Sequence, residues 1–244
     1  MLFALLVGLG GRHVAPVPLG IHGRWHVIFD DEFTGSALDT NKWSTGWYGS
    51  GVTGPVNVRK ESQCYAPSQV AVQAGELDLS LIARTETCNT GSGTITRPYL
   101  SGIVTTNGKF AYTYGYLEAR VWLPGAGTVA DWPAIWGVGQ NWPTDGELDV
   151  VEGIGGKVCW HFHDAVADPG TCVRRRYTGG WHTFGANWER GVVTWYYDGV
   201  RIGRARAGIT GKPMYLVLDL AASISRPVEA PASLRVRYVR VWQH

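Results

Sequence analysis

Short runs of alternating hydrophobic and polar residues recur along the chain and end at residues that favour turns. The clearest runs are residues 77–81, 117–123, 193–202 and 214–220, and the third contains the hairpin signal Asp198-Gly199. Successive side chains of a strand point to opposite faces, so this pattern predicts half-buried strands. No window keeps a helical period over three turns. The pattern therefore predicts an all-β fold, either a sandwich or a barrel.

The 244 residues are enough for one large all-β domain, and no linker or repeat divides them after about residue 25. Residues 1–10 are apolar over about the length of a signal-peptide core, which is too short to span a bilayer. We expect residues 1–20 to be a signal peptide or a disordered N-terminal segment and residues 21–244 to form a single domain. The protein is therefore expected to be secreted, with no membrane segment.

Charge and composition narrow the possible ligands. The chain has 22 Lys+Arg and 20 Asp+Glu, a formal net charge of +2, and only 17% charged residues. This balance does not provide the excess of positive charge that is typical of proteins that bind nucleic acid. The 12 tryptophans and 11 tyrosines exceed what an ordinary core requires. Rings outside the core are available to stack on a ligand.

An even number of cysteines fits an oxidising compartment and allows two disulfides. The four are Cys64, Cys88, Cys159 and Cys172. The short loop between Cys159 and Cys172 is typical of a local disulfide, and elimination then pairs Cys64 with Cys88. A zinc site formed by Cys159, His161, His163 and Cys172 is the alternative, because these residue types suit zinc.

Residues 147–152 place three carboxylates in an apolar context. Glu147 and Asp149 share one strand face, whereas Glu152 joins them only if a β-bulge is inserted at Val150-Val151. The two glutamates would then be about 13 Å apart at Cα. Their converging side chains would leave a carboxyl gap of roughly 5–6 Å, which suits a retaining glycosidase. Mutual repulsion and burial would raise the pKa of one acid and make it a proton donor.

The alternative interpretation is an acidic edge strand that only faces solvent. Trp132, Trp136 and Trp142 precede the acids in a stretch rich in proline and glycine. Flat aromatic side chains are the surfaces on which sugar rings stack. This context favours a glycan site over a solvated edge.

Residues 132–136 (WPAIW), Trp142-Pro143 and residues 146–153 (GELDVVEG) resemble the signature of glycoside hydrolase family 16. The extra hydrophobic residue before Glu152 resembles the laminarinase-like, endo-β-1,3-glucanase branch. Residues 29–33 and 238–242 resemble the opening and closing strands of the family, so the similarity covers most of the chain.

The resemblance implies a concanavalin A-like β-jelly-roll sandwich of two antiparallel sheets with a concave glycan cleft. It implies a retaining, endo-acting hydrolase of β-1,3-glucan or mixed β-1,3-1,4-glucan that works by double displacement. Residues 21–244 would be its catalytic domain, acting as a monomer whose partner is the polysaccharide, with no nucleic acid or membrane. Glu147 matches the nucleophile and Glu152 the acid/base, and Asp149 would tune both through a short hydrogen bond.

The resemblance also implies a set of substrate-binding residues, with different roles. Trp132, Trp136 and Trp142 match aromatic platforms, and Asn57 resembles a residue that binds sugar hydroxyls. Arg120 would bind sugar or brace Glu118, and His163 would lie near the leaving-group subsites or be structural. The set is Asn57, Arg120, Trp132, Trp136, Trp142 and His163.

One position departs from the family. Many members carry an aspartate in the last strand, two residues before the tyrosine that corresponds to Tyr238, where it helps to bind a structural calcium ion. Arg237 or its neighbour takes that place here. A guanidinium can replace the charge of the ion but cannot coordinate it. We therefore expect no calcium, no other metal and no cofactor.

Two other functions share this fold and stay open. A transglycosylase, which transfers glycans to glycans, would use the same acids. A non-catalytic β-glucan-binding, lectin-like domain would keep the tryptophans and lose the acids, so the presence of Glu147 and Glu152 favours an enzyme.

Overall fold

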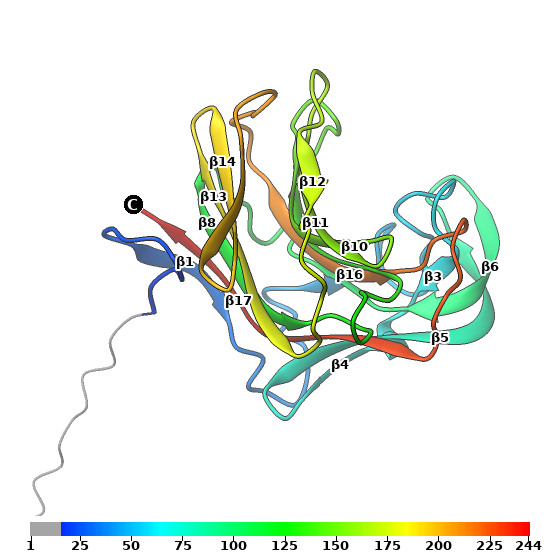
Figure 1. Cartoon of the computed structure of the whole chain (residues 1–244). Helices are drawn as coiled ribbons and strands as arrows, with labels where there is room; N and C mark the ends of the chain where they lie inside the picture. Colours follow the sequence, from blue (N-terminus) through cyan, green and yellow to red (C-terminus); the bar gives the residue numbers. More distant parts are fainter. Residues whose placement is uncertain (1–15) are drawn as a thin grey trace, which may run out of the picture.

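Two β-sheets packed face to face make up almost all of the computed structural model, which describes residues 16–244 (Figure 1). The strands are β1 (His26–Asp31), β2 (Ser44–Thr45), β3 (Gln63–Tyr65), β4 (Val70–Gln73), β5 (Glu76–Asn89), β6 (Thr94–Ser101), β7 (Ile103–Thr105), β8 (Gly115–Trp122), β9 (Trp132–Val138), β10 (Glu147–Ile154), β11 (Lys157–His163), β12 (Gly170–Cys172), β13 (Trp181–Glu189), β14 (Val192–Tyr197), β15 (Val200–Ala205), β16 (Tyr215–Ala221) and β17 (Ala232–Gln243). A 3₁₀ turn, η1 (Pro67–Gln69), precedes β4.

The first sheet has the strand order β15-β14-β13-β8-β17-β5-β6-β3, with β1 beside β17 and β4 beside β5. The second sheet has the order β12-β11-β10-β9-β16-β7-β2. Neighbours are antiparallel apart from the parallel pair β3–β6. The expected all-β jelly-roll sandwich is confirmed, and the four alternating runs lie in β5, β8, β14–β15 and β16.

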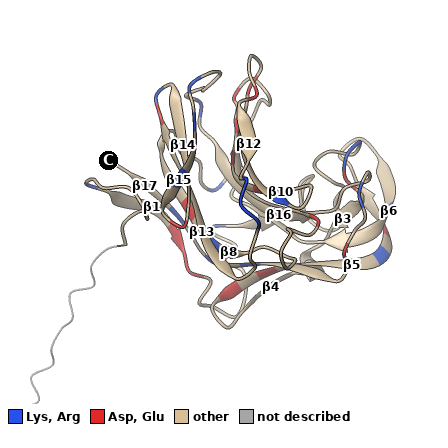
Figure 2. Cartoon of the chain, in the orientation of Figure 1, with Lys and Arg blue, Asp and Glu red and all other residues tan. Residues whose placement is uncertain are grey.

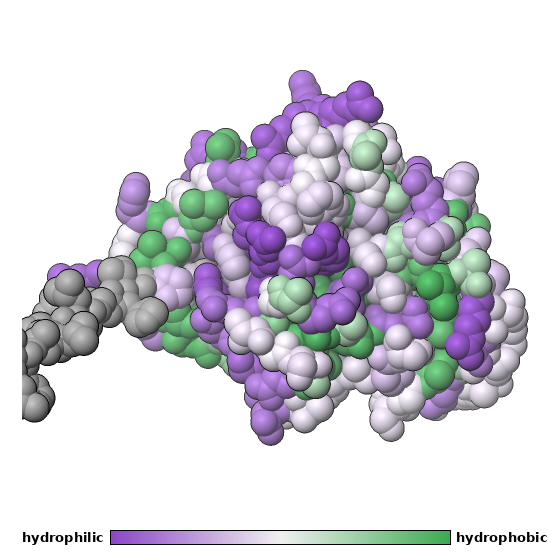
Figure 3. Space-filling view, turned by 90° about the horizontal axis from the view of Figure 1, so that it is seen from below, coloured by the Kyte–Doolittle hydropathy of each residue, from purple (hydrophilic) through white to green (hydrophobic). Residues whose placement is uncertain are grey.

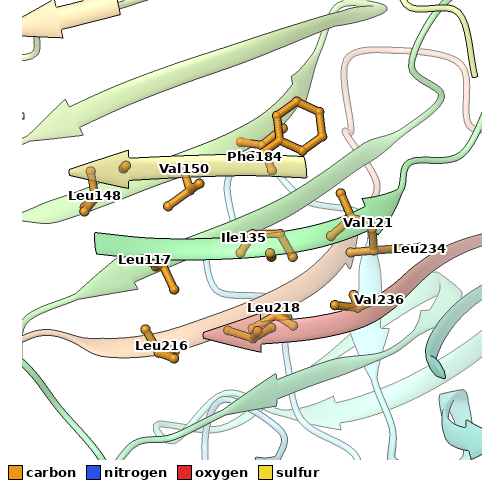
Figure 4. Packing of buried hydrophobic residues seen from close by; sticks show 14 of the residues in the cluster. Leu117, Val121, Ile135, Leu148, Val150, Phe184, Leu216, Leu218, Leu234 and Val236 are labelled. Atoms are coloured by element: carbon orange, nitrogen blue, oxygen red, sulfur yellow. The ribbon is translucent and has the colours of Figure 1, made fainter. Parts of the chain in front are cut away.

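The core fills the space between the sheets, where apolar side chains from both layers meet (Figure 4). The first sheet contributes Leu117, Val121, Phe184, Leu234 and Val236, and the second contributes Ile135, Leu148, Val150, Leu216 and Leu218. All of these are at most 1% exposed. Since alternate residues of each strand point away from this layer, the outer face of the second sheet is free to carry polar groups.

Strand β10 contains the predicted bulge. Its register against β9 shifts between Asp149 and Val151, and its register against β11 shifts between Asp149 and Glu152. Val150 and Val151 are consecutive, yet both are buried in the core between the sheets. The extra residue returns Glu152 to the outer face of the sheet, which Glu147 and Asp149 also occupy.

The segment before β1 is attached to the first sheet. The Leu19 N–H donates to Glu118 Oε2 at 2.8 Å, and the Leu19 carbonyl accepts from the Tyr116 hydroxyl at 2.9 Å. The Trp242 indole donates to the Pro16 carbonyl at 2.8 Å. The folded part therefore includes residues 16–20, ahead of the expected boundary. The rest of the expected signal peptide or disordered segment lies outside the described residues.

Two disulfides have the expected pairing, Cys64–Cys88 and Cys159–Cys172. The zinc alternative is therefore wrong, because Cys159 and Cys172 are bonded to each other. These two residues face each other across β11 and β12, so their bond fixes the edge strand and the loop that leads into it.

Lys and Arg residues are interspersed with Asp and Glu residues along the chain (Figure 2). The face seen from below also mixes hydrophilic and hydrophobic residues (Figure 3). No helix among residues 16–244 has the length and apolar character needed to cross a membrane.

Arg237 in β17 lies next to the position, two residues before Tyr238, where the family resemblance places a calcium ligand. Its Nε is 3.3 Å from Glu76 Oε1, and its guanidinium lies 4.2 Å from the centre of the Trp181 ring. Arg235 donates to the second oxygen of Glu76 at 2.8 Å. Guanidinium groups offer donors and no ligand oxygen, so this arrangement does not fit a calcium ion.

We therefore predict that chelation leaves the protein unchanged. The melting temperature measured in EDTA should equal the value in calcium, because Arg235 and Arg237 already neutralise Glu76. A melting temperature that falls in EDTA and recovers with calcium would place a calcium site in this protein and contradict the alignment of β17.

Candidate active site

A cavity of about 610 Å³ opens on the outer face of the second sheet, over β9, β10, β11 and β16. Eight of the residues predicted to act on substrate line it, namely Asn57, Trp132, Trp136, Trp142, Glu147, Asp149, Glu152 and His163. The bulge brings Glu152 to this face beside Glu147 and Asp149, and loops from other parts of the chain supply the walls.

Arg120 is the predicted site residue that lies elsewhere. Its neighbours Ala119 and Val121 point into the core, so Arg120 lies on the outer face of the first sheet, across the sandwich from the cavity. Its guanidinium donates to Thr183 Oγ1 at 3.3 Å. The prediction that Arg120 binds sugar is wrong, because parity along β8 turns it away from the cavity. It does not brace Glu118 either, whose oxygens accept from Leu19 and Tyr238.

Both carboxylate oxygens of Glu152 are held. The Trp132 indole donates to Oε1 at 3.0 Å, and His161 Nδ1 lies 2.9 Å from Oε2. Trp132, expected as a sugar platform, therefore also orients this acid. The two donors would stabilise the carboxylate whenever Glu152 gives up its proton.

His163 lies between two groups of acids. Its Nδ1 is 2.7 Å from Asp168 Oδ1, on the loop before β12. Its Nε2 is 3.0 Å from Asp149 Oδ2 and 3.7 Å from Glu147 Oε1. An imidazolium at this position would offset the negative charge of the acids.

Asp149 is almost fully buried and incompletely paired. His163 approaches its Oδ2 at close range, but that oxygen makes no hydrogen bond of good geometry within the described residues. The expected short hydrogen bond from Asp149 to a glutamate is not formed in this structure. Its backbone carbonyl accepts from the buried Trp195 indole at 2.8 Å, which anchors β10 beside the bulge.

Clustering shifts the protonation of the acids. Burial, followed by repulsion from Asp149, raises the pKa of Glu147 to about 9, although His163 acts in the opposite direction. Burial, followed by repulsion from Glu152, raises the pKa of Asp149 well above its usual range. Burial acts more strongly on Asp149, whose side chain is 3% exposed, than on Glu147, whose side chain is 21% exposed.

A second acidic pair forms the floor of the cavity. Asp219 in β16 accepts from the Trp136 indole and from the Tyr65 hydroxyl, each at 2.7 Å. Glu61 Oε2 lies 3.4 Å from the same hydroxyl. Burial is the main cause that raises the pKa of Glu61 and of Asp219 to about 7 each.

The tryptophans of the cavity differ in exposure. Trp136 is 7% exposed and stacks on Trp47, with ring centres 5.7 Å apart. Trp142 is 61% exposed. Asn57 also lies at the surface, and its side-chain oxygen accepts from the Arg59 N–H at 3.1 Å. Trp142 is thus a free platform, whereas Trp136 is part of the wall.

Sequence reasoning missed several residues of this site: Trp47, Glu61, Tyr65, His161, Asp168 and Asp219. His161 had a signal, because it shares a strand face with His163, but it was considered only as a zinc ligand. Asp219 had one too, since it is an acid in an otherwise apolar run. Asp168 lies in a loop, where nothing in the sequence marks it.

Four side chains, Asp149, Glu152, His161 and His163, each bring one potential ligand atom within 4.8 Å of the others. His161 and His163 direct these nitrogens at carboxylates of the same group, at 2.9 and 3.0 Å. Contacts within the group thus account for the arrangement without an ion, and the expectation of no metal stays a prediction.

Comparison with known proteins identifies relatives of this site. Residues 107–160, which include β9 and β10, match the family model described as an XgeA-like catalytic GH16 domain. The chain is 26% identical over 260 residues to glucan endo-1,3-beta-glucosidase A1 of Niallia circulans, a match that covers 89% of the chain and 38% of that protein. It is 35% identical over 133 residues to endo-1,3-1,4-beta-glycanase ExsH of Rhizobium meliloti, covering 50% of the chain and 28% of the relative.

The chain thus spans well under half the length of these two curated relatives. Among solved structures, it resembles SCLam, a non-specific endo-beta-1,3(4)-glucanase from family GH16, with a TM-score of 0.75 and 26% identity. That match covers 93% of this chain and 94% of the other.

The exposure of the tryptophans predicts different effects of alanine substitution. Trp142→Ala should weaken binding of an oligosaccharide by about 1–3 kcal/mol, on the scale of aromatic stacking on bases, and leave the melting temperature unchanged. Trp136→Ala should also destabilise the fold by about 3–5 kcal/mol, because it opens a cavity. Calorimetric titration and thermal melting measure the two effects. Equal melting temperatures for both variants would contradict this division.

The raised pKa of Glu147 predicts a pH-dependent cost to stability. The fold favours the protonated carboxyl, so stability should fall as pH rises from the ordinary glutamate value of 4.5 towards about 9. Glu147→Gln should therefore have the wild-type melting temperature near pH 4.5. At pH 8 it should melt a few degrees above the wild type, since each kcal/mol of stability raises the melting temperature by about 2–4 °C. The exposed Glu189→Gln is the control and should show no such pH dependence. A difference in melting temperature between Glu147→Gln and the wild type that is the same at both pH values would contradict the prediction.

Proposed function

Because the chain belongs to glycoside hydrolase family 16, as the resemblance of its sequence predicted, we propose that it is a retaining endo-hydrolase of β-1,3- or mixed β-1,3-1,4-glucan. One observation carries the proposal. The bulge in β10 places Glu147 and Glu152 on the same face of the sheet, in the wall of one cavity. The substrate class follows from the names of the relatives, which are endo-1,3- and endo-1,3-1,4-β-glucanases.

The two glutamates divide the chemistry. Glu147, as a carboxylate, attacks the anomeric carbon while Glu152 protonates the departing glycosidic oxygen. A covalent glycosyl-enzyme forms, and water then opens it with Glu152 acting as the base. The Trp132 indole and His161 stabilise the negative charge that Glu152 acquires in the first step.

Asp149 and His163 support the ionised state of Glu147. A proton on the buried Asp149 removes one repulsive charge from beside the nucleophile. His163, oriented by Asp168, places its Nε2 3.7 Å from Glu147 and favours the carboxylate when it is protonated. These contacts favour the carboxylate of Glu147, although burial and the repulsion from Asp149 still raise its pKa to about 9.

The enzyme should act outside the cell, as a monomer and without a metal or cofactor. The two disulfides support an oxidising compartment. The retention of the acids, with their hydrogen-bonded supports, favours catalysis over a lectin-like role. Product analysis will separate hydrolysis from transfer to another glycan.

Azide rescue tests the two roles on an activated aryl β-glycoside. Glu147→Ala should be almost inactive and should recover with azide, giving an α-glycosyl azide by a single displacement. Glu152→Ala should give a β-glycosyl azide, because its nucleophile is intact and azide replaces water in the second step. The wild-type enzyme should release β product first, as followed by NMR.

Glu189→Ala is the control, since it removes an exposed acid of β13 that does not line the cavity and has no part in either displacement. It should form no glycosyl azide. An α product from the wild-type enzyme, or the same azide anomer from both glutamate variants, would contradict the assignment of the two roles.

A further inference from the structure

A second, smaller cavity of about 300 Å³ lies beside the active-site cavity. Its walls come from the start of β9, the end of β10 and the segments 59–60 and 223–226. The two cavities share Lys60, Trp132 and Ile154. A glycan bound in the active site therefore has direct access to the smaller cavity, on the side of Trp132, whose indole holds Glu152.

Three cationic side chains line this smaller cavity, Arg59, Lys60 and Arg226, and all three residues are exposed. Among the described residues none of them pairs with a carboxylate, whereas Arg235 and Arg240 each do. Three unpaired positive charges in one concavity repel one another, and an anion placed between them would relieve that repulsion.

Asp131 is the one acid in this wall. Its Oδ1 accepts the backbone N–H of Glu229 at 3.0 Å, and its Oδ2 is buried. Burial, followed by the repulsion of Glu229, raises the pKa of Asp131, which opposes its negative charge. The balance of charge in the cavity is therefore positive, although the whole chain carries a formal charge of only +2.

The backbone that carries the cations is fixed. The Ile224 N–H donates to the Lys60 carbonyl at 2.9 Å, and the Ser62 N–H donates to the Ala222 carbonyl at 2.8 Å. These bonds join the segment before β3 to the segment after β16, although about 160 residues separate them. The three cations are thus presented by two segments of fixed relative position.

Glycine at position 155 allows Arg226 to approach the end of β10. A Cβ atom built there would lie 3.1 Å from the Arg226 Nη1, so the guanidinium packs closely over the backbone of Gly155. Arg226 is therefore directed along the cavity wall, and the hydroxyls of Ser223 and Ser225 add donors beside it.

We propose that this cavity binds an acidic substituent, a carboxylate or a sulfate ester, carried by the glycan that occupies the active site. The proposal rests on the proposed function and narrows its substrate class from neutral glucans to glucans with anionic groups. Arg59, Lys60 and Arg226 supply the charge, and the serine hydroxyls supply neutral donors.

Binding tests the cavity independently of catalysis. Affinity electrophoresis of Glu147→Gln protein compares neutral β-1,3-glucan with its carboxymethylated and sulfated derivatives of the same chain length. The derivatives should retard the protein more than the neutral parent, and less so as salt rises. Adding Arg59→Gln or Arg226→Gln should weaken this preference by up to about fivefold each, the scale of a partly exposed ion pair. Arg204→Gln, an exposed cation on β15, is the matched control and should leave it unchanged.

Cleavage tests the proposed function separately, by comparing kcat/KM on the same polymers with Glu147 intact. Arg59→Gln and Arg226→Gln should lower kcat/KM on the acidic derivatives and leave that on neutral glucan unchanged. Equal retardation by neutral and acidic glucans would overturn the cavity proposal, even if the enzyme cuts both. Preferential binding of the acidic derivatives without cleavage of any polymer would support the cavity and overturn the proposed function. The derivative that is bound more tightly identifies carboxylate or sulfate as the preferred group.

Discussion

Val150 and Val151 pack side by side into the apolar core although they are neighbours in one strand, and the candidate active site depends on this contact. Each buried valine contributes about 1.5–3 kcal/mol relative to an exposed one. A regular strand would turn one valine towards the cavity and Glu152 into the core. An isolated charge in the core costs several kcal/mol unless it is paired, so the bulged register is strongly preferred. The core thus fixes the position of the two glutamates.

The acids that the bulge gathers are costly to the fold, and the surrounding residues reduce that cost. Trp132 and His161 hold Glu152, while His163, held in place by Asp168, lies beside Asp149 and Glu147. These partners come from β9, β11 and the loop before β12, which the Cys159–Cys172 disulfide secures. Stability given up at such a cluster is the usual cost of a functional site.

The cavity has two sides of different character. Its floor is a buried network in which Asp219 joins Trp136 and Tyr65, so these side chains shape the site and stabilise the sheet together. Its rim is exposed and includes Trp142, and the cations of the neighbouring smaller cavity, around Arg226, are exposed as well. Substitutions in the floor should therefore alter folding and binding together, whereas substitutions at the rim should alter binding and leave folding unchanged.

The sequence by itself determined what depends on local order along the chain. Alternation predicted the strands, the extra valine predicted the bulge and the shared face of Glu147, Asp149 and Glu152, and the short loop predicted the Cys159–Cys172 bond. Only the tertiary structure decided which outer face carries the cavity, and it placed Arg120 on the wrong side for a sugar contact. It also separated the exposed Trp142 from the buried Trp136, and it brought Asp168 and Asp219 to the acids. The alternation of side chains between the two faces is set within each strand. Which strands lie next to one another, and which segments cover each face of a sheet, follow from the order of strands in the sheets.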